Sequence, residues 1–146
     1  MKRLFYHGTE SVEFADFRPE QYFTPRFELA RRYALNLVGW RRVVGGSSRV
    51  ISVEIEIGDY PEFLGIGQGA EKTHRGAVEL GRSSGSAAVW LPDTAAPIGV
   101  AEGKTELLVL DTSIISVVGR EFVYFTKWEE EFNERWSGVD ENDFTF

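Results

Sequence analysis

The strongest local signal in the chain is the segment RVISVEIEI at residues 49–57. Isoleucine or valine occupies every second position from 51 to 57, and most of the positions between them are polar. Successive side chains of a strand point to opposite faces of a sheet, so this alternation predicts a strand with one buried and one polar face. The fold therefore contains a half-buried sheet.

Other short apolar runs supply partner strands for this sheet. Strands are predicted at residues 3–8, 21–23, 87–91, 105–111 and 120–125, and residues 114–118 are expected to be extended. Strands and helices do not alternate as they do in doubly wound folds. The expected class is therefore α+β, with about six short strands.

One principal helix is predicted from Pro25 to about Arg42. Thr24 is placed to cap it, and Pro25 falls in its first turn, where the missing N–H costs nothing. Its apolar residues recur at helical spacing: Ala30, Tyr33, Ala34, Leu37 and Trp40. Glycines and serines at 45–48 end the helix.

Residues 65–103 hold eight of the fifteen glycines and are expected to be irregular apart from the strand at 87–91. The segment GIGQG at 65–69 lacks the spacing and the strand–helix setting of a dinucleotide-binding loop. His74 lies beside the basic residues Lys72 and Arg75 in the sequence and is interpreted as a surface residue of this loop.

Composition limits what the chain can do. Its 146 residues are 42% apolar, enough for one core, so residues 1–146 are expected to form a single domain. The absence of cysteine excludes disulfides and thiolate chemistry, and with two histidines no metal site is expected. The N-terminal residues lack a long apolar segment, which predicts a soluble cytoplasmic protein without a signal peptide or membrane span.

The net charge of −7 is unevenly distributed. Residues 26–49 carry six arginines and one glutamate, whereas residues 127–146 carry seven acidic and two basic side chains. The basic segment could contact phosphates or be an ordinary solvated helix face. In the acidic segment, Trp128, Phe132 and Trp136 recur every four residues, which predicts a short helix. This segment is expected to pack on the domain, with its aromatic stripe in the core or its acids over the basic helix.

Three segments together resemble a known family. The segments YHGT at 6–9, YFTPRFELARRY at 22–33 and TELLVLD at 105–111 are similar, in this order, to the motif regions of ADP-ribosyltransferases of the diphtheria-toxin and poly(ADP-ribose) polymerase type. The eleven residues from Tyr22 to Tyr33 match the usual interval of that family. The resemblance implies a split β-sheet sandwich with one principal helix and NAD⁺ as co-substrate.

The resemblance also assigns roles to individual residues. Glu106 would stabilise the oxocarbenium-like ribose that forms when the nicotinamide bond breaks, with His7 and Tyr22 as the other members of the catalytic group. His7 would bind a ribose hydroxyl of the adenosine half. The residues implied in NAD⁺ binding are His7, Gly8, Thr9, Tyr22, Ala30 and Tyr33. In this reading the two tyrosine rings hold nicotinamide, the Gly8 backbone binds its carboxamide and Ala30 leaves room beside it.

Alternatives remain for these assignments. His7 could be a half-buried histidine before a turn, and Tyr33 lies on the apolar stripe of its helix. The rivals of Glu106 are Glu102, Glu54 and Glu56. Members that modify arginine usually have arginine in place of the first-strand histidine and an acid or glutamine two residues before the catalytic glutamate. Here those positions hold His7 and Lys104, so arginine-directed transfer is not expected.

Mono-ADP-ribosylation of a macromolecule is the expected activity, in a bacterial or phage toxin or defence effector that a neutralising antitoxin or immunity protein could accompany. The arginine-rich segment slightly favours RNA or DNA over protein as acceptor. Three alternatives stay open: an inactive reader of NAD⁺ or ADP-ribose, an NAD⁺ glycohydrolase, and a small-molecule transferase that modifies antibiotics. An RNA 2′-phosphotransferase ranks lower, because its site is expected to hold more arginine and histidine.

Overall fold

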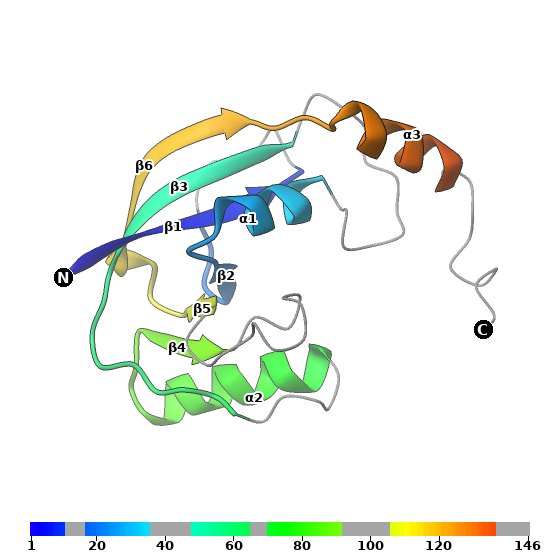
Figure 1. The fold of residues 1–146 in the computed structure, drawn as a ribbon. Helices are drawn as coiled ribbons and strands as arrows, with labels where there is room; N and C mark the ends of the chain where they lie inside the picture. Colours follow the sequence, from blue (N-terminus) through cyan, green and yellow to red (C-terminus); the bar gives the residue numbers. More distant parts are fainter. Residues whose placement is uncertain (11–16, 36–47, 65–69, 92–105, 137–146) are drawn as a thin grey trace.

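The computed structural model describes residues 1–10, 17–35, 48–64, 70–91 and 106–136, and it confirms the α+β class (Figure 1). The first sheet has the order β1-β3-β6 and is antiparallel: β1 (Lys2–Thr9), β3 (Arg49–Glu56) and β6 (Ile115–Phe122). The second sheet has the order β2-β5-β4 and is also antiparallel: β2 (Gln21–Phe23), β5 (Glu106–Val109) and β4 (Ala88–Leu91).

The alternating strand that the sequence predicts is β3, the middle strand of the first sheet. Ile51, Val53 and Ile55 are fully buried on its inner face. There they join a core that fills the space between the two sheets, with Phe5 from β1 and Phe23 from β2. Burying each of these large side chains contributes about 1.5–3 kcal/mol, so this core is the main stabilising contact of the fold.

A helix covers the outer face of each sheet. Helix α1 (Phe27–Ala34) packs on the first sheet through Ala30 and Ala34, which contact the cluster around Val50. Helix α2 (Ala70–Ser83) packs on the second sheet through Ala77 and Val78. Figure 1 shows α1 beside β1 of the first sheet and α2 beside β4 of the second sheet, with β6 and α2 at opposite ends of the view.

The prediction that residues 65–103 are irregular is wrong for residues 70–83, because they form the 14-residue helix α2. Two glycines, each costing about 1 kcal/mol in a helix, obscured it in the sequence. Both lie close to neighbouring side chains: a Cβ on Gly76 would lie 2.5 Å from Phe63, and one on Gly81 would lie 2.3 Å from Leu110, so a larger residue would require these side chains to shift. Close contact with neighbouring elements therefore outweighs local propensity. The segment 65–69 and residues 92–103 lie outside the described residues.

Helix α1 begins later than predicted. The first helical residue is Phe27, and Arg26, with extended backbone angles, is the N-cap in place of Thr24. The Thr24 hydroxyl instead accepts a hydrogen bond from the Arg26 N–H at 3.2 Å, which forms a turn before the helix. Residues 36–42, the predicted second half of this helix, lie outside the described residues. The described chain also contains α2, a second helix that the prediction of one principal helix did not include.

The C-terminal part of the described chain differs in two details. A single strand, β6, replaces the predicted pair at 114–118 and 120–125, and a 3-10 turn (Thr112–Ile114) precedes it. The predicted acidic helix is present as α3 (Lys127–Trp136). The prediction that Trp128 could pack in the core is wrong, because this side chain is 71% exposed. The side chains of residues 132–136 lie outside the described part.

Helix α3 is attached to α1 by an ion pair between Arg31 and Glu129, both of which are largely buried. Glu129 also accepts a hydrogen bond from the Thr126 N–H at 2.8 Å, while its own N–H donates to the Thr126 hydroxyl at 3.2 Å. This reciprocal pair is a capping box. The hydrogen bond from Arg31 lowers the pKa of Glu129 to about 2. At this contact, an acid of the C-terminal segment does lie over the basic helix.

We expect Glu129→Gln to lower the free energy of unfolding by about 1–2 kcal/mol near neutral pH, because it removes the charge that pairs with Arg31. The pKa of the carboxyl is depressed in the folded state, so its stabilisation is complete above about pH 4.5 and is lost as the pH falls towards 2. Urea unfolding at several pH values measures this. Glu131→Gln, an exposed change on the same helix, is the control. A constant difference between wild type and Glu129→Gln down to low pH would contradict the assignment.

Candidate functional site

The two sheets are joined by backbone hydrogen bonds at a single place in the described chain. The Tyr6 N–H donates to the Thr24 carbonyl at 2.7 Å, and the Thr24 N–H donates to the Tyr6 carbonyl at 3.0 Å. Tyr6 belongs to β1 of the first sheet, and Thr24 follows β2 of the second. The residues next to this junction, His7 and Tyr22, are therefore held at a fixed position between the sheets.

His7 reaches from the first sheet to the second. Its Nδ1 lies 2.8 Å from the main-chain oxygen of Tyr22. A carbonyl oxygen can only accept, so Nδ1 carries the proton, and Nε2 of the neutral ring is the nitrogen without one. The ring also packs against Phe17 and Phe23, each with a centroid separation of 5.4 Å. Burial lowers the pKa of His7, although the hydrogen bond to Tyr22 opposes this shift. His7 is therefore neutral at neutral pH.

The side chain of Tyr22 points away from the core between the sheets, to the face of the second sheet on which α2 packs. Tyr22 is paired with Leu108 on β5 and packs in the cluster beneath α2. Its hydroxyl lies 2.7 Å from Nδ1 of His74. Burial, together with the negative charges of Glu106 and Glu20, raises the pKa of Tyr22 to about 12. The phenol is therefore protonated throughout the physiological range.

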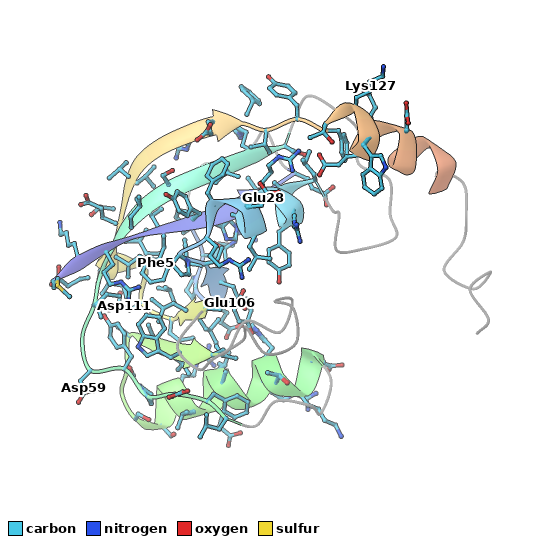
Figure 2. All side chains as sticks on the ribbon, in the orientation of Figure 1. Phe5, Glu28, Asp59, Glu106, Asp111 and Lys127 are labelled. Atoms are coloured by element: carbon cyan, nitrogen blue, oxygen red, sulfur yellow. The ribbon has the colours of Figure 1, made fainter. Side chains whose placement is uncertain are left out.

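Glu106 is the first residue of β5 and is half-buried. It pairs with Leu91 of β4 and, two residues before Leu108, falls on the same face of the sheet as Tyr22. Its charge is the largest electrostatic contribution to the raised pKa of Tyr22. In Figure 2 it lies beside β5, whereas Asp59 lies at the periphery of the molecule. Glu106 therefore lies on the same face of the second sheet as the Tyr22 side chain, whereas the His7 ring packs against Phe23 and reaches only the backbone of Tyr22.

The structure also brings together Gly8 and Ala30. A Cβ on Gly8 would lie 2.0 Å from the Ala30 carbonyl oxygen and 2.8 Å from the Ala34 nitrogen. The glycine and the small residue thus allow α1 to lie directly on β1, a structural reason that is independent of any ligand. Thr9 ends β1 opposite Arg49.

Tyr33 is placed by another element than Tyr22. It lies on α1, which packs on the first sheet, and it is 36% exposed, whereas the Tyr22 ring lies in the cluster beneath α2. The rings of Tyr22 and Tyr33 therefore belong to elements that pack on different sheets. The two-ring clamp around nicotinamide stays a prediction.

Two rivals of Glu106, Glu54 and Glu56, belong to the first sheet. Glu54 is on β3 of the first sheet, between Leu4 and Ser116. Glu56 is exposed and pairs with the N-terminal amine at 2.7 Å, a hydrogen bond that lowers its pKa. Glu102 and Lys104 lie outside the described residues.

Sequence analysis missed the partners of Tyr22. His74 is on helix α2, so its interpretation as a loop surface residue is wrong. Its Nε2 lies 3.6 Å from the Glu20 carboxylate, which also accepts a hydrogen bond from Arg82 at 2.6 Å. The apolar pairs Ala77-Val78 and Leu80-Gly81, three residues apart, are the helical signal that could have placed His74 beneath the second sheet.

The described segments contain no group of three or more histidine, cysteine or acidic side chains able to hold a metal ion. Among those same segments, no helix has the length and apolar character needed to span a membrane. No protein-family model matches the chain, and neither does any curated protein.

His7→Asn tests the electrostatics of the site. An asparagine amide can still donate to the Tyr22 carbonyl but does not titrate. Because the folded-state pKa of His7 is depressed, wild type should lose stability as the pH falls below about 6.5, by at most about 1.4 kcal/mol per pH unit from this group. The variant should lose less between about pH 7 and pH 5, as measured by urea unfolding.

His7→Leu is the matched control, because it neither titrates nor donates. It should be less stable than His7→Asn at neutral pH by about 1–3 kcal/mol, since it leaves the Tyr22 carbonyl without this donor. If wild type and His7→Asn lose stability equally on acidification, His7 does not have a depressed pKa in the folded state.

Proposed function

We propose that this chain is an NAD⁺-dependent mono-ADP-ribosyltransferase, which cleaves the bond between nicotinamide and ribose and transfers ADP-ribose to an acceptor. The observation that carries the proposal is the hydrogen bond between His7 Nδ1 and the Tyr22 carbonyl at the junction of the sheets. It places His7 of the first sheet against the backbone of Tyr22 in the second, so two positions that the resemblance implies are adjacent. Glu106, the third, lies close enough to raise the pKa of Tyr22.

The charges of the site suit a cationic transition state. NAD⁺ carries a positive nicotinamide ring, and as the glycosidic bond breaks the positive charge moves to the ribose. The ionised carboxylate of Glu106 would stabilise this charge, and its partial burial would strengthen the interaction by reducing water screening. Neutral His7 adds no positive charge that would oppose the reaction. Its Nε2 has the acceptor character needed to bind a ribose hydroxyl.

In the proposed reaction, the bond between ribose C1′ and the nicotinamide nitrogen breaks, and its electron pair leaves with nicotinamide. An oxygen or nitrogen of the acceptor then bonds to C1′ and releases its proton, which Glu106 or solvent can take up. The Tyr22 hydroxyl is hydrogen-bonded to His74, so the part of Tyr22 that would contact nicotinamide is its ring face. Water in place of the acceptor would make the same chemistry an NAD⁺ hydrolysis.

The acceptor is the least constrained part of the proposal. The basic segment slightly favours a nucleic acid, but two of its arginines are paired with acids. Arg31 bonds to Glu129 and Glu28, and Arg32 lies 3.7 Å from Glu28. Their charges are thus partly neutralised within the protein. The proposed acceptor remains a macromolecule: RNA, DNA or protein. The proposed role of the chain is that of a toxin or defence effector, which a neutralising partner would accompany.

Glu106→Gln should reduce nicotinamide release by at least about a hundredfold while changing the affinity for NAD⁺ only slightly, because the carboxylate charge acts mainly in the transition state. The measurement incubates the protein with labelled NAD⁺ and a cell extract divided into protein, RNA and DNA fractions. It follows both nicotinamide release and incorporation of label. Glu54→Gln, a glutamate of the first sheet, is the matched control and should keep wild-type activity.

The outcomes separate the candidate functions. Label that depends on Glu106 and enters one fraction supports the transferase and identifies its acceptor class. Release of nicotinamide without label supports a glycohydrolase, and label on an added antibiotic supports a small-molecule transferase. Tight binding of NAD⁺ or ADP-ribose with no release under any condition would contradict the proposal in favour of a reader.

A further inference from the structure

A chain of polar side chains leads from Tyr22 to the outer surface of α2. The Tyr22 hydroxyl lies 2.7 Å from Nδ1 of His74, and Nε2 of His74 lies 3.6 Å from Oε2 of Glu20. Arg82 Nη2 donates to Oε1 of Glu20 at 2.6 Å. The two rings of Tyr22 and His74 are also in contact, with centroids 5.5 Å apart. These residues come from β2, the segment before it and α2.

The neighbours of His74 favour one tautomer of its ring. Nε2 faces the Glu20 carboxylate, which accepts, so the tautomer with the proton on Nε2 suits this group, and in it Nδ1 is the acceptor. The Tyr22 hydroxyl is then the donor to Nδ1. Arg82, which is 67% exposed, holds the other carboxylate oxygen of Glu20. The order of the group is therefore Arg82, Glu20, His74 and Tyr22, with the phenol as the last donor.

The backbone of Glu20 indicates that its position matters. Glu20 has φ of 70°, the left-handed region that side chains with a Cβ rarely adopt. Its N–H donates to the Val109 carbonyl at 2.9 Å, so β5 holds the residue in this conformation. The turn directs the Glu20 carboxylate to His74 and Arg82 of α2. Such strain persists only where surrounding contacts impose it.

A carboxylate, a histidine and a hydroxyl in this order can serve two purposes. In nucleophilic catalysis the histidine removes the hydroxyl proton. Here burial and the nearby carboxylates raise the pKa of Tyr22 to about 12, which opposes loss of that proton. The same contacts do favour a neutral phenol whose ring is fixed in one orientation. This second purpose, to hold a neutral phenol in one orientation, is the one that the electrostatics of the site support.

We propose that His74 is the positioning residue of the NAD⁺ site: by accepting the hydrogen bond of the Tyr22 hydroxyl it fixes the ring face that stacks on nicotinamide. This inference rests on the proposed transferase function. Glu20 and Arg82 in turn orient the His74 ring. Helix α2, which the sequence resemblance does not include, thereby becomes part of the site.

The hydrogen bond itself can be tested without any activity. The chain has two histidines, so imidazole nitrogen resonances in an NMR spectrum are few enough to assign. Tyr22→Phe removes the hydroxyl and should shift Nδ1 of His74. His7 is an internal control, because its partner is the main-chain carbonyl of residue 22, which the substitution keeps. An unchanged His74 Nδ1 resonance would overturn the inference whatever the enzyme does.

The functional role is tested by kinetics. His74→Phe removes the acceptor and should raise KM for NAD⁺ about three- to tenfold with kcat within about twofold, since the loss is one of ring orientation. His74→Asn places an amide oxygen near the position of Nδ1 and should restore most of the affinity. The double variant with Tyr22→Phe should be no worse than the weaker-binding single variant, because both remove the same hydrogen bond.

The outcomes distinguish the inference from the function on which it rests. If wild type releases nicotinamide and His74→Phe matches its KM, the positioning role is wrong while the transferase stands. Additive effects of His74→Phe and Tyr22→Phe also contradict it. If wild type releases no nicotinamide, the proposed function fails, and with it the role of His74 in NAD⁺ binding, while the NMR result still decides whether the hydrogen bond exists.

Discussion

The structure depends on the short contact between its two sheets. The reciprocal hydrogen bonds of Tyr6 and Thr24 connect β1 to the end of β2, and His7 adds a side-chain bond to the neighbouring Tyr22 carbonyl. The apolar core between the sheets supplies the burial that holds them face to face. Non-directional burial does not set the relative position of the sheets by itself, whereas hydrogen bonds do. The junction therefore fixes where the candidate catalytic side chains lie.

The electrostatics of the site follow from the same geometry. Burial keeps His7 neutral by lowering its pKa, and burial keeps Tyr22 neutral by raising its pKa. Glu106 adds a carboxylate on the face of the second sheet where the Tyr22 ring lies. A negative charge on the face of the neutral Tyr22 ring is a suitable environment for a flat cationic ring and a sugar that becomes positive. This complementarity is the physical basis of the proposed function.

Local patterns predicted the strands better than the helices. The alternation in β3 and the apolar run of β1 are visible because a sheet with one buried face imposes a period of two. Helix α2 was missed because Gly76 and Gly81, which permit its close packing, have low helix propensity.

The resemblance to a known motif named His7, Tyr22 and Glu106 as candidate site residues, and their roles stay predictions. The contact between Tyr22 and His74 joins residues 52 positions apart. It exists only once α2 has docked on the second sheet, so no local pattern contains it.

The most direct test of the central claim is a crystal structure of Glu106→Gln with NAD⁺ bound, since this variant should bind the co-substrate without consuming it. The account predicts that a ribose hydroxyl lies within hydrogen-bonding distance of His7 Nε2 and that the nicotinamide ring lies on the face of Tyr22. NAD⁺ bound away from the junction of the two sheets, or absent at saturating concentration, would contradict it.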